Sequence, residues 1–230
     1  INAKNHEPKV VLTYKSEEEV IISELIAGIN QDDITSAKDG DFIDKASLVY
    51  NTPFAIRNRT QLEKTYLLAR RMRFTVGEKD IAFYDFAKIT ADNISTPNLA
   101  FKNYKDSSEK GYINTFNHVT AQVFITALFS EELAGFIADV HELKAMPELT
   151  SGKFTESQLT DTLNYPVDNY VDMINNEIGQ ELGKTLAEKY NISEHTIWTP
   201  VLLSDFLNDI QDYYMWALNI GLKPYKPNNY

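Results

Sequence analysis

The chain has 230 residues, of which 43% are hydrophobic and 12% aromatic, and its formal net charge at pH 7 is −11. This composition excludes a disordered chain, because disorder requires low hydrophobicity, and the negative charge argues against binding to nucleic-acid phosphates. No apolar run approaches the roughly 18 residues that a membrane-spanning helix needs. These properties predict a soluble, acidic, globular protein that binds no nucleic acid and has no transmembrane segment in this chain.

The absence of cysteine suits both the cytosol and the periplasm, so the expected location comes from the rest of the composition. Cysteine is absent, which excludes disulfides, thiolate metal ligands and cysteine nucleophiles. The chain begins at Ile1 instead of methionine, and its abundance of Asn, Lys and Tyr is typical of exported bacterial proteins. We therefore expect an exported protein of the periplasm or cell surface, with any lipid or receptor anchor not visible in this chain.

The first elements are a strand-like segment and a helix. Residues 9–14 read Lys-Val-Val-Leu-Thr-Tyr and are β-like, but a single short strand makes no sheet. Ser16 and Glu19 have the spacing of a capping box, in which each side chain satisfies a free amide at the start of a helix. Apolar residues then recur with helical spacing, which predicts a helix over about residues 16–29.

Two more helices are predicted before the middle of the chain. Thr60 and Glu63 form a second capping box and begin a helix, and another helix is predicted over residues 78–90. We expect residues 1–95 to form a helical segment that packs on the main domain.

The rest of the chain is predicted to be helical as well. The residues around 95–110 are rich in Pro, Asn and Ser and mark a boundary, after which we expect a main domain over 110–222 and an extended tail over 223–230. Its helices are predicted at 112–130, 131–145, after the Thr155 capping box, at 166–190, and from Thr199-Pro200 to Gly221. The fold class is therefore all-α: an irregular bundle of about seven to nine helices, with a central apolar helix near 112–130.

Polar side chains interrupt the apolar pattern of the helix at 112–130. Asn114, His118 and Gln122 form a row at i, i+4 and i+8. A buried polar group without a hydrogen-bond partner costs about 1–3 kcal/mol, so these residues are either bonded structural groups or part of a functional cleft.

The helix at 131–145 carries an acid and an imidazole close together. Asp139 and His141 lie about 100° to either side of its apolar stripe, and Glu142 lies opposite that stripe. Such groups can perform acid–base chemistry or bind a metal. An exposed charged face would have the same spacing, and spacing alone favours that interpretation.

The helix at 166–190 has an apolar ridge on one side and a polar row on the other. The polar row contains Asp168, Asp172, Asn175 and Asn176, and it continues into two glycines. Glycine within a helix costs about 1 kcal/mol relative to alanine, so Gly179 and Gly183, four residues apart, predict the close approach of another backbone or a ligand. We therefore predict a buried polar centre built by three helices, with catalytic candidates His118, Asp139, His141 and Asp172 and ligand-binding candidates Gln122, Asn175 and Asn176.

Three blocks over about residues 110–185 resemble an uncharacterised bacterial family of all-helical domains of unknown function. The family carries Arg-His-Ala, Ala-Asp-Ala-His-Glu and Met-Asp-x-His-Asn-Asn-x-x-Gly-Arg. The matching blocks here are Asn-His-Val at 117–119, Ala-Asp-Val-His-Glu at 138–142 and Val-Asp-Met-Ile-Asn-Asn-Glu-Ile-Gly-Gln at 171–180. The resemblance implies a compact helical domain with one site formed by His118, Asp139, His141, Asp172, Asn175 and Asn176.

The departures from that family concern charged and titratable groups. Asn117 and Gln180 stand where the family has arginine, and Ile174 stands where it has histidine. These changes remove groups that bind anions or transfer protons, whereas the packing residues are kept. We therefore expect a retained scaffold without cofactor: a non-catalytic accessory or interaction component of a bacterial cell-envelope or surface assembly, whose partners are other proteins.

Two alternatives remain open. In the first, the protein is a hydrolase in which His118 or His141 is the base, Asp139 or Asp172 orients it or binds a divalent cation, and Asn175 and Asn176 position the substrate. In the second, the polar centre binds a carbohydrate or a peptide, with Trp198 and Trp216 as stacking residues. Aromatic residues near the C-terminus are typical of interfaces, although a helical core explains them equally well: Tyr213, Tyr214, Trp216, Tyr225 and Tyr230.

Overall fold

The computed structural model divides the chain into two compact units, each built from two stretches. The first unit contains Ile1–Arg59 and Gly135–Glu177, and the second contains Thr60–Ala134 and Ile178–Tyr230. The sequence-based boundary at 95–110 falls largely outside the described residues. The structure describes residues 9–15, 20–26, 39–50, 53–69, 82–97, 111–146, 148, 153–161 and 167–227.

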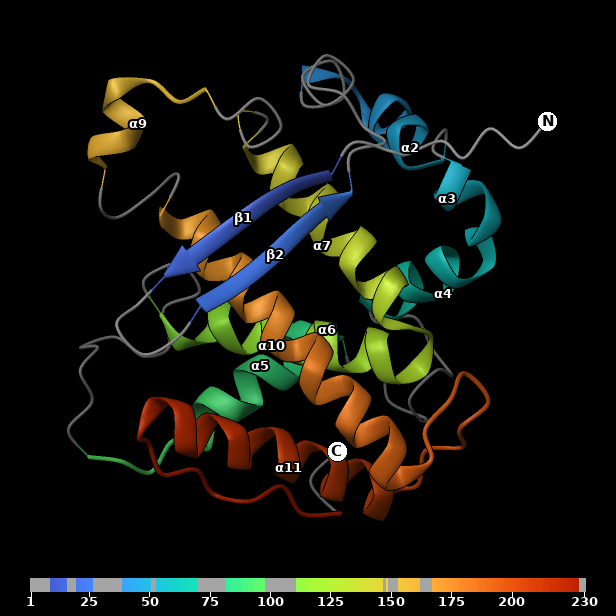
Figure 1. The fold of residues 1–230 in the computed structure, drawn as a ribbon. Helices are drawn as coiled ribbons and strands as arrows, with labels where there is room; N and C mark the ends of the chain where they lie inside the picture. Colours follow the sequence, from blue (N-terminus) through green and yellow to red (C-terminus); the bar gives the residue numbers. More distant parts are fainter. Residues whose placement is uncertain are drawn as a thin grey trace. The chain divides into compact units, whose positions relative to one another are not determined.

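The first unit combines a two-stranded hairpin with helices (Figure 1). Its helix α2 begins at a reciprocal cap, because Asp41 Oδ1 accepts from the amides of Ile43 and Asp44 at 2.7 and 3.1 Å, and Asp44 Oδ2 accepts from the amide of Asp41 at 3.1 Å. Phe54 and Phe136 pack with ring centroids 4.8 Å apart. The elements are β1 (Lys9–Lys15), β2 (Val20–Ile26), α2 (Phe42–Tyr50), α3 (Pro53–Arg57), most of α7 (Glu131–Ala145), α9 (Glu156–Thr160) and the first half of α10 (Val167–Tyr190).

The regular elements of the second unit, among its described residues, are all helices. They are α4 (Arg59–Ala69) without its first residue, α5 (Phe83–Asp92), α6 (Tyr112–Leu128), the start of α7, the second half of α10, and α11 (Pro200–Leu218). Across the described parts of both units the structure gives bounds for nine helices. The predicted all-α class is therefore confirmed, and the hairpin of β1 and β2 is the only sheet among the described residues.

The helix predicted over residues 16–29 is wrong, because residues 20–26 form the strand β2. Strand β2 pairs with β1 in antiparallel register, from Lys9 opposite Ile26 to Lys15 opposite Val20. The sequence of β2 begins with three consecutive β-branched residues, Val20-Ile21-Ile22, which favour strands. The predicted strand at 9–14 is confirmed, and β2 supplies the partner that it was expected to lack.

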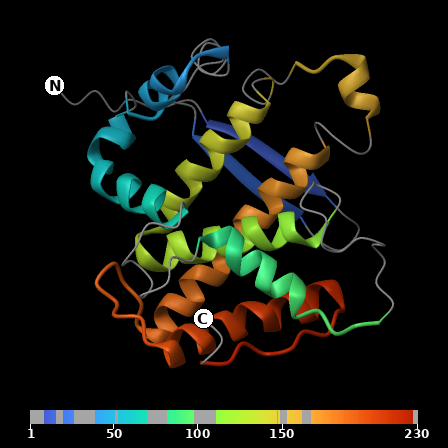
Figure 2. The same ribbon diagram turned by 180° about the vertical axis from the view of Figure 1, so that it is seen from behind.

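The central apolar helix near 112–130 is confirmed as α6. Phe116 and Phe124 on α6 are fully buried, and α5 packs against α6 (Figure 2). The Phe124 ring lies 5.3 Å from Phe86 of α5 and 5.0 Å from Phe206 of α11 between centroids. Tyr214 of α11 is buried, and its hydroxyl donates to the Phe116 carbonyl at 3.1 Å. Helix α6 is thus the core of the second unit.

Capping signals in the sequence identified the starts of two helices, at Thr155 and Thr199, whereas the capping box predicted at Thr60 is wrong, because α4 already begins at Arg59. The Thr155 capping box is present at the start of α9, and Thr199 Oγ1 accepts from the amide of Leu202 at the start of α11. The predicted end of α11 at Gly221 is wrong by three residues. Helix α11 ends at Leu218 because Asn219 adopts the left-handed conformation, with φ 51°; asparagine tolerates this conformation and stops helices in the same way as glycine.

The segment after α11 is held to the second unit by a buried tyrosine. The Tyr225 hydroxyl donates to the carbonyl of Phe86 at 2.9 Å and also bonds Thr90 Oγ1 at 2.9 Å. The amide of Tyr225 donates to Asn208 Oδ1 at 2.7 Å. Residues 223–227 have no regular helix or strand, so their position is fixed by the bonds of Tyr225 and by a backbone bond from the Lys223 amide to the Asn93 carbonyl at 2.8 Å.

Candidate functional site

Helix α10 buries its polar row and partly exposes its apolar ridge. In the first unit Asp172 and Asn176 are 5% and 4% exposed, whereas Val171 on the ridge is 46% exposed. Burying polar groups in place of available apolar ones costs free energy. The arrangement therefore has to be explained by the partners that the polar side chains find.

Glu142 of α7 is the centre of these contacts. Its side chain is 2% exposed. Asn169 Nδ2 donates to Glu142 Oε2 at 2.8 Å, and Asn176 Nδ2 donates to Glu142 Oε1 at 3.3 Å. Two turns of α10 thus hold both oxygens of one carboxyl group. We call the buried polar residues that α7 and α10 contribute to the first unit the carboxylate–amide cluster: Asp139, Glu142, Asn169, Asp172, Asn175 and Asn176. Within it, Asn169, Asp172 and Asn176 interact with Glu142.

The pKa of Glu142 is raised from its usual value of 4.5 to about 8. Burial is the largest cause, because it removes water from the charged form, and the nearby charge of Asp172 is the second. The hydrogen bonds from Asn169 and Asn176 lower the pKa but do not compensate, and Asp168 raises it further. At neutral pH Glu142 is therefore mostly a neutral acid.

Two polar atoms of the carboxylate–amide cluster have no hydrogen-bond partner among the described residues. They are Oδ1 of Asn169, whose side chain is 1% exposed, and Nδ2 of Asn175, whose side chain is 8% exposed. Each such atom costs about 1–3 kcal/mol when nothing satisfies it. Asn169 Oδ1 can therefore still accept a hydrogen bond or bind a cation, and Asn175 Nδ2 can still donate a hydrogen bond.

Neither of the predicted histidines is buried. His141 is exposed, although one of its ring nitrogens lies within 4.8 Å of a carboxylate oxygen of Glu142. His118 is half-buried on α6 and belongs to the second unit. In the first unit the structure therefore brings carboxylates and amides together in the interior and leaves an imidazole at the surface.

Gln122, also predicted as a ligand-binding residue, has a structural partner in the second unit. Its side chain is buried, and Gln122 Oε1 accepts from Gln180 Nε2 of α10 at 3.0 Å. This bond pairs the side-chain oxygen of Gln122 with the side-chain nitrogen of Gln180 across the contact between α6 and α10. The interpretation of Gln122 as a bonded structural residue is therefore the one that the geometry supports.

The prediction that Gly179 and Gly183 mark the close approach of another backbone is confirmed in the second unit. A Cβ atom at Gly179 would lie 2.7 Å from the carbonyl oxygen of Val119, and one at Gly183 would lie 2.8 Å from that of Val123. Real Cβ atoms do not approach other atoms so closely. The two glycines therefore allow α10 to lie directly on the backbone of α6.

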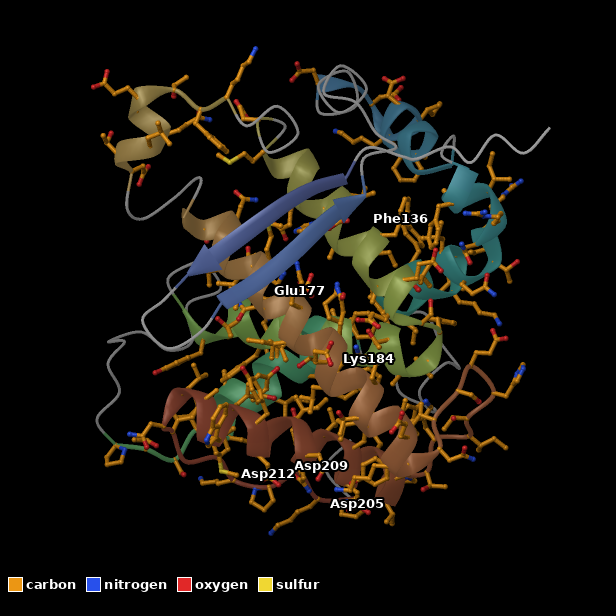
Figure 3. All side chains as sticks on the ribbon, viewed as in Figure 1. Phe136, Glu177, Lys184, Asp205, Asp209 and Asp212 are labelled. Carbon is orange, nitrogen blue, oxygen red and sulfur yellow. The ribbon has the colours of Figure 1, made fainter. Side chains whose placement is uncertain are left out.

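The outer face of α11 exposes both apolar and acidic side chains. Val201 and Trp216 are 57% and 79% exposed, and three aspartates lie between them at helical spacing: Asp205, Asp209 and Asp212 (Figure 3). Asp205 and Asp212 are exposed, while Asp209 binds Lys189 Nζ at 2.6 Å. We call this surface, Val201, Asp205, Asp212 and Trp216, the α11 face. Trp198, in contrast, is half-buried and packs against the rings of Phe124 and Phe206.

Sequence reasoning missed the two residues that organise the cluster. Glu142 lies opposite the apolar stripe of α7 and was expected to face solvent, which is wrong, since it is buried. Asn169 was not singled out. A signal for it was available, because Asn169, Asp172 and Asn176 have the spacing i, i+3 and i+7 of one helix face.

Comparisons with known proteins do not extend this description. No family model, curated protein or solved structure matches the chain, so the resemblance to a bacterial family of unknown function stays a prediction. In the described part of the chain, no helix is long and apolar enough to cross a lipid bilayer.

Proposed function

We propose that the protein is a non-catalytic interaction component of a bacterial cell-envelope or surface assembly, and that it binds a basic segment of a partner protein through the α11 face. The observation that carries this proposal is the exposure of Trp216 beside an acidic helix surface. The location in the envelope comes from the composition of the chain and is part of the proposal.

The chemistry of the α11 face indicates the kind of partner. Helix α11 contains three aspartates and neither lysine nor arginine. Its negative charge therefore attracts a positively charged segment. Val201 and Trp216 offer apolar area at the two ends of the acidic stretch. Tryptophan is enriched among the residues that dominate binding energy. The α11 face therefore fits a helix or extended segment that presents Lys or Arg between apolar side chains.

Burial of the candidate catalytic groups also favours binding over catalysis. Asp139, Glu142 and Asp172 are all more than nine-tenths buried, so an organic substrate has no direct access to their oxygens in this structure. A catalytic acid or base must come within about 3 Å of the substrate atom that it serves, or reach it through one water.

The proposal is tested by affinity purification from the envelope fraction of the source cell with wild type, Trp216→Ala and the double variant Asp205→Asn/Asp212→Asn. We expect co-purified partner protein to fall at least about tenfold with Trp216→Ala, because hot-spot residues contribute about 2 kcal/mol or more. We expect the aspartate variant to remove most of the salt dependence of binding.

The matched controls are Tyr66→Ala, which removes another exposed aromatic of the second unit, and Glu132→Gln, which removes an exposed acid outside α11. Both should bind as the wild type does. Trp216→Ala should fold normally, since surface substitutions change stability by about 0.5 kcal/mol or less. A wild-type protein that remains a lone monomer, or equal recovery with all variants, would contradict the proposal.

One observation favours the hydrolase alternative. Glu142 has a pKa of about 8 and lies within 4.8 Å of the exposed His141, and a carboxyl group that titrates near neutral pH beside an imidazole is suited to proton transfer. In that case the wild type should hydrolyse a chromogenic ester or phosphoester, and Glu142→Gln should lower the rate about 100-fold or more. Equal rates in wild type and variant would eliminate this mechanism.

A further inference from the structure

We propose that the carboxylate–amide cluster of the first unit binds a divalent metal ion that prefers oxygen ligands, with Glu142, Asp172 and the side-chain oxygen of Asn169 as its ligands. This site is separate from the α11 face, which belongs to the other unit. Metal binding by the cluster and partner binding by the α11 face can therefore be tested independently.

The first argument is the density of buried acid groups. Glu142 and Asp172 are each more than nine-tenths buried, and Asp172 lies on the face of α10 that also carries Asn169 and Asn176, which both donate to Glu142. Like charges in a poorly hydrated site repel each other strongly. A bound cation replaces this repulsion with attraction and allows the acids to ionise together.

The second argument is independent of charge and comes from Asn169. Its Nδ2 donates to Glu142 Oε2 at 2.8 Å, which places the amide group of Asn169 next to the carboxyl group of Glu142. Its Oδ1 has no hydrogen-bond partner among the described residues, although the side chain is 1% exposed. An amide oxygen of this kind is a common ligand of calcium and related ions. The free oxygen of Asn169 therefore favours a cation bound next to the carboxyl group of Glu142.

The ligand chemistry and the degree of burial limit the identity of the occupant. The proposed ligands are all oxygens, which select Ca²⁺, Mg²⁺ or Mn²⁺ over softer metals. The ligand residues are too buried to admit an organic molecule without rearrangement.

The experiment uses the full chain, freed of metal with a chelator, and titrates it with Mn²⁺, Mg²⁺ and Ca²⁺ separately by calorimetry and thermal unfolding. We expect one ion to bind per chain and the unfolding temperature to rise by about 5–10 °C when the free ion exceeds its dissociation constant a hundredfold. Glu142→Gln and Asn169→Ala should each weaken binding about tenfold or more, whereas the exposed acid variant Glu132→Gln should bind as the wild type does.

Asn169→Asp separates a ligand from a merely structural residue. This variant retains an oxygen ligand and adds a negative charge, so it should unfold at a lower temperature in chelator and recover at least to the wild-type temperature when the ion is added. Recovery should be absent in Asn169→Ala. The proposal is overturned if none of the three ions binds the wild type at up to about 10 mM, the weak end of protein calcium sites, or if Glu142→Gln binds as tightly as the wild type.

Discussion

Glu142→Gln should make the protein more stable than the wild type above pH 8, by about 4–5 kcal/mol in free energy of unfolding, and equally stable near pH 4. The pKa of Glu142 is about 8 in the folded state against 4.5 for an unperturbed glutamate, and each unit of difference corresponds to about 1.4 kcal/mol. Folding therefore favours the neutral acid. This contribution is fully present below pH 4.5, is lost as the pH rises from about 4.5 to 8, and then stays constant.

Glutamine is a suitable replacement because it has the size of the neutral acid and cannot ionise. Its side-chain oxygen can still accept from Asn169 or Asn176, which both donate to Glu142 in the wild type. The measurement is urea unfolding at pH values from 4 to 9 in the presence of chelator, so that no ion contributes. Glu132→Gln, an exposed position on the same helix, should follow the wild-type curve. If the free energies of unfolding of wild type and Glu142→Gln changed with pH in the same way, Glu142 would not be the buried neutral acid described above.

Gly183→Ala should destabilise the second unit by about 1–2 kcal/mol, although alanine is the better helix former by about 1 kcal/mol. The added Cβ would lie 2.8 Å from the carbonyl oxygen of Val123 and 2.7 Å from Cβ of Thr126. A backbone carbonyl cannot rotate out of the way, so α6 and α10 must move apart, and overpacking of this kind typically costs about 1–3 kcal/mol. For a chain of this size we expect the unfolding temperature to fall by about 2–8 °C.

Glu188→Ala is the matched control for this prediction, because Glu188 is an exposed residue of the same helix. Its stability should change by about 0.5 kcal/mol or less. Gly179→Ala should resemble Gly183→Ala, since its Cβ would lie 2.7 Å from the carbonyl oxygen of Val119. If both glycine variants were more stable than the wild type, helix propensity would dominate and the direct packing of α10 on α6 would be refuted.

Elements with strong local signals were predictable from the sequence alone. Helix α7 has the predicted bounds Glu131–Ala145, and α9 and α11 begin at the predicted caps Thr155 and Thr199. Capping and helical periodicity act between residues a few positions apart, so the sequence contains all the information that they need. Strand β2 was not predictable in this way, because its pattern fits both a helix and a strand, and pairing with β1 decides between them.

The candidate site also combines features that local sequence patterns predict with features that depend on long-range packing. The sequence by itself determined that α10 carries a polar row with two glycines, and hence that something approaches this side of the helix closely. Only the tertiary structure decided that Glu142 lies inside and that Asn169 contacts it. The physical reason is that periodicity shows which side chains share a face, whereas the burial of that face depends on segments far away in the chain.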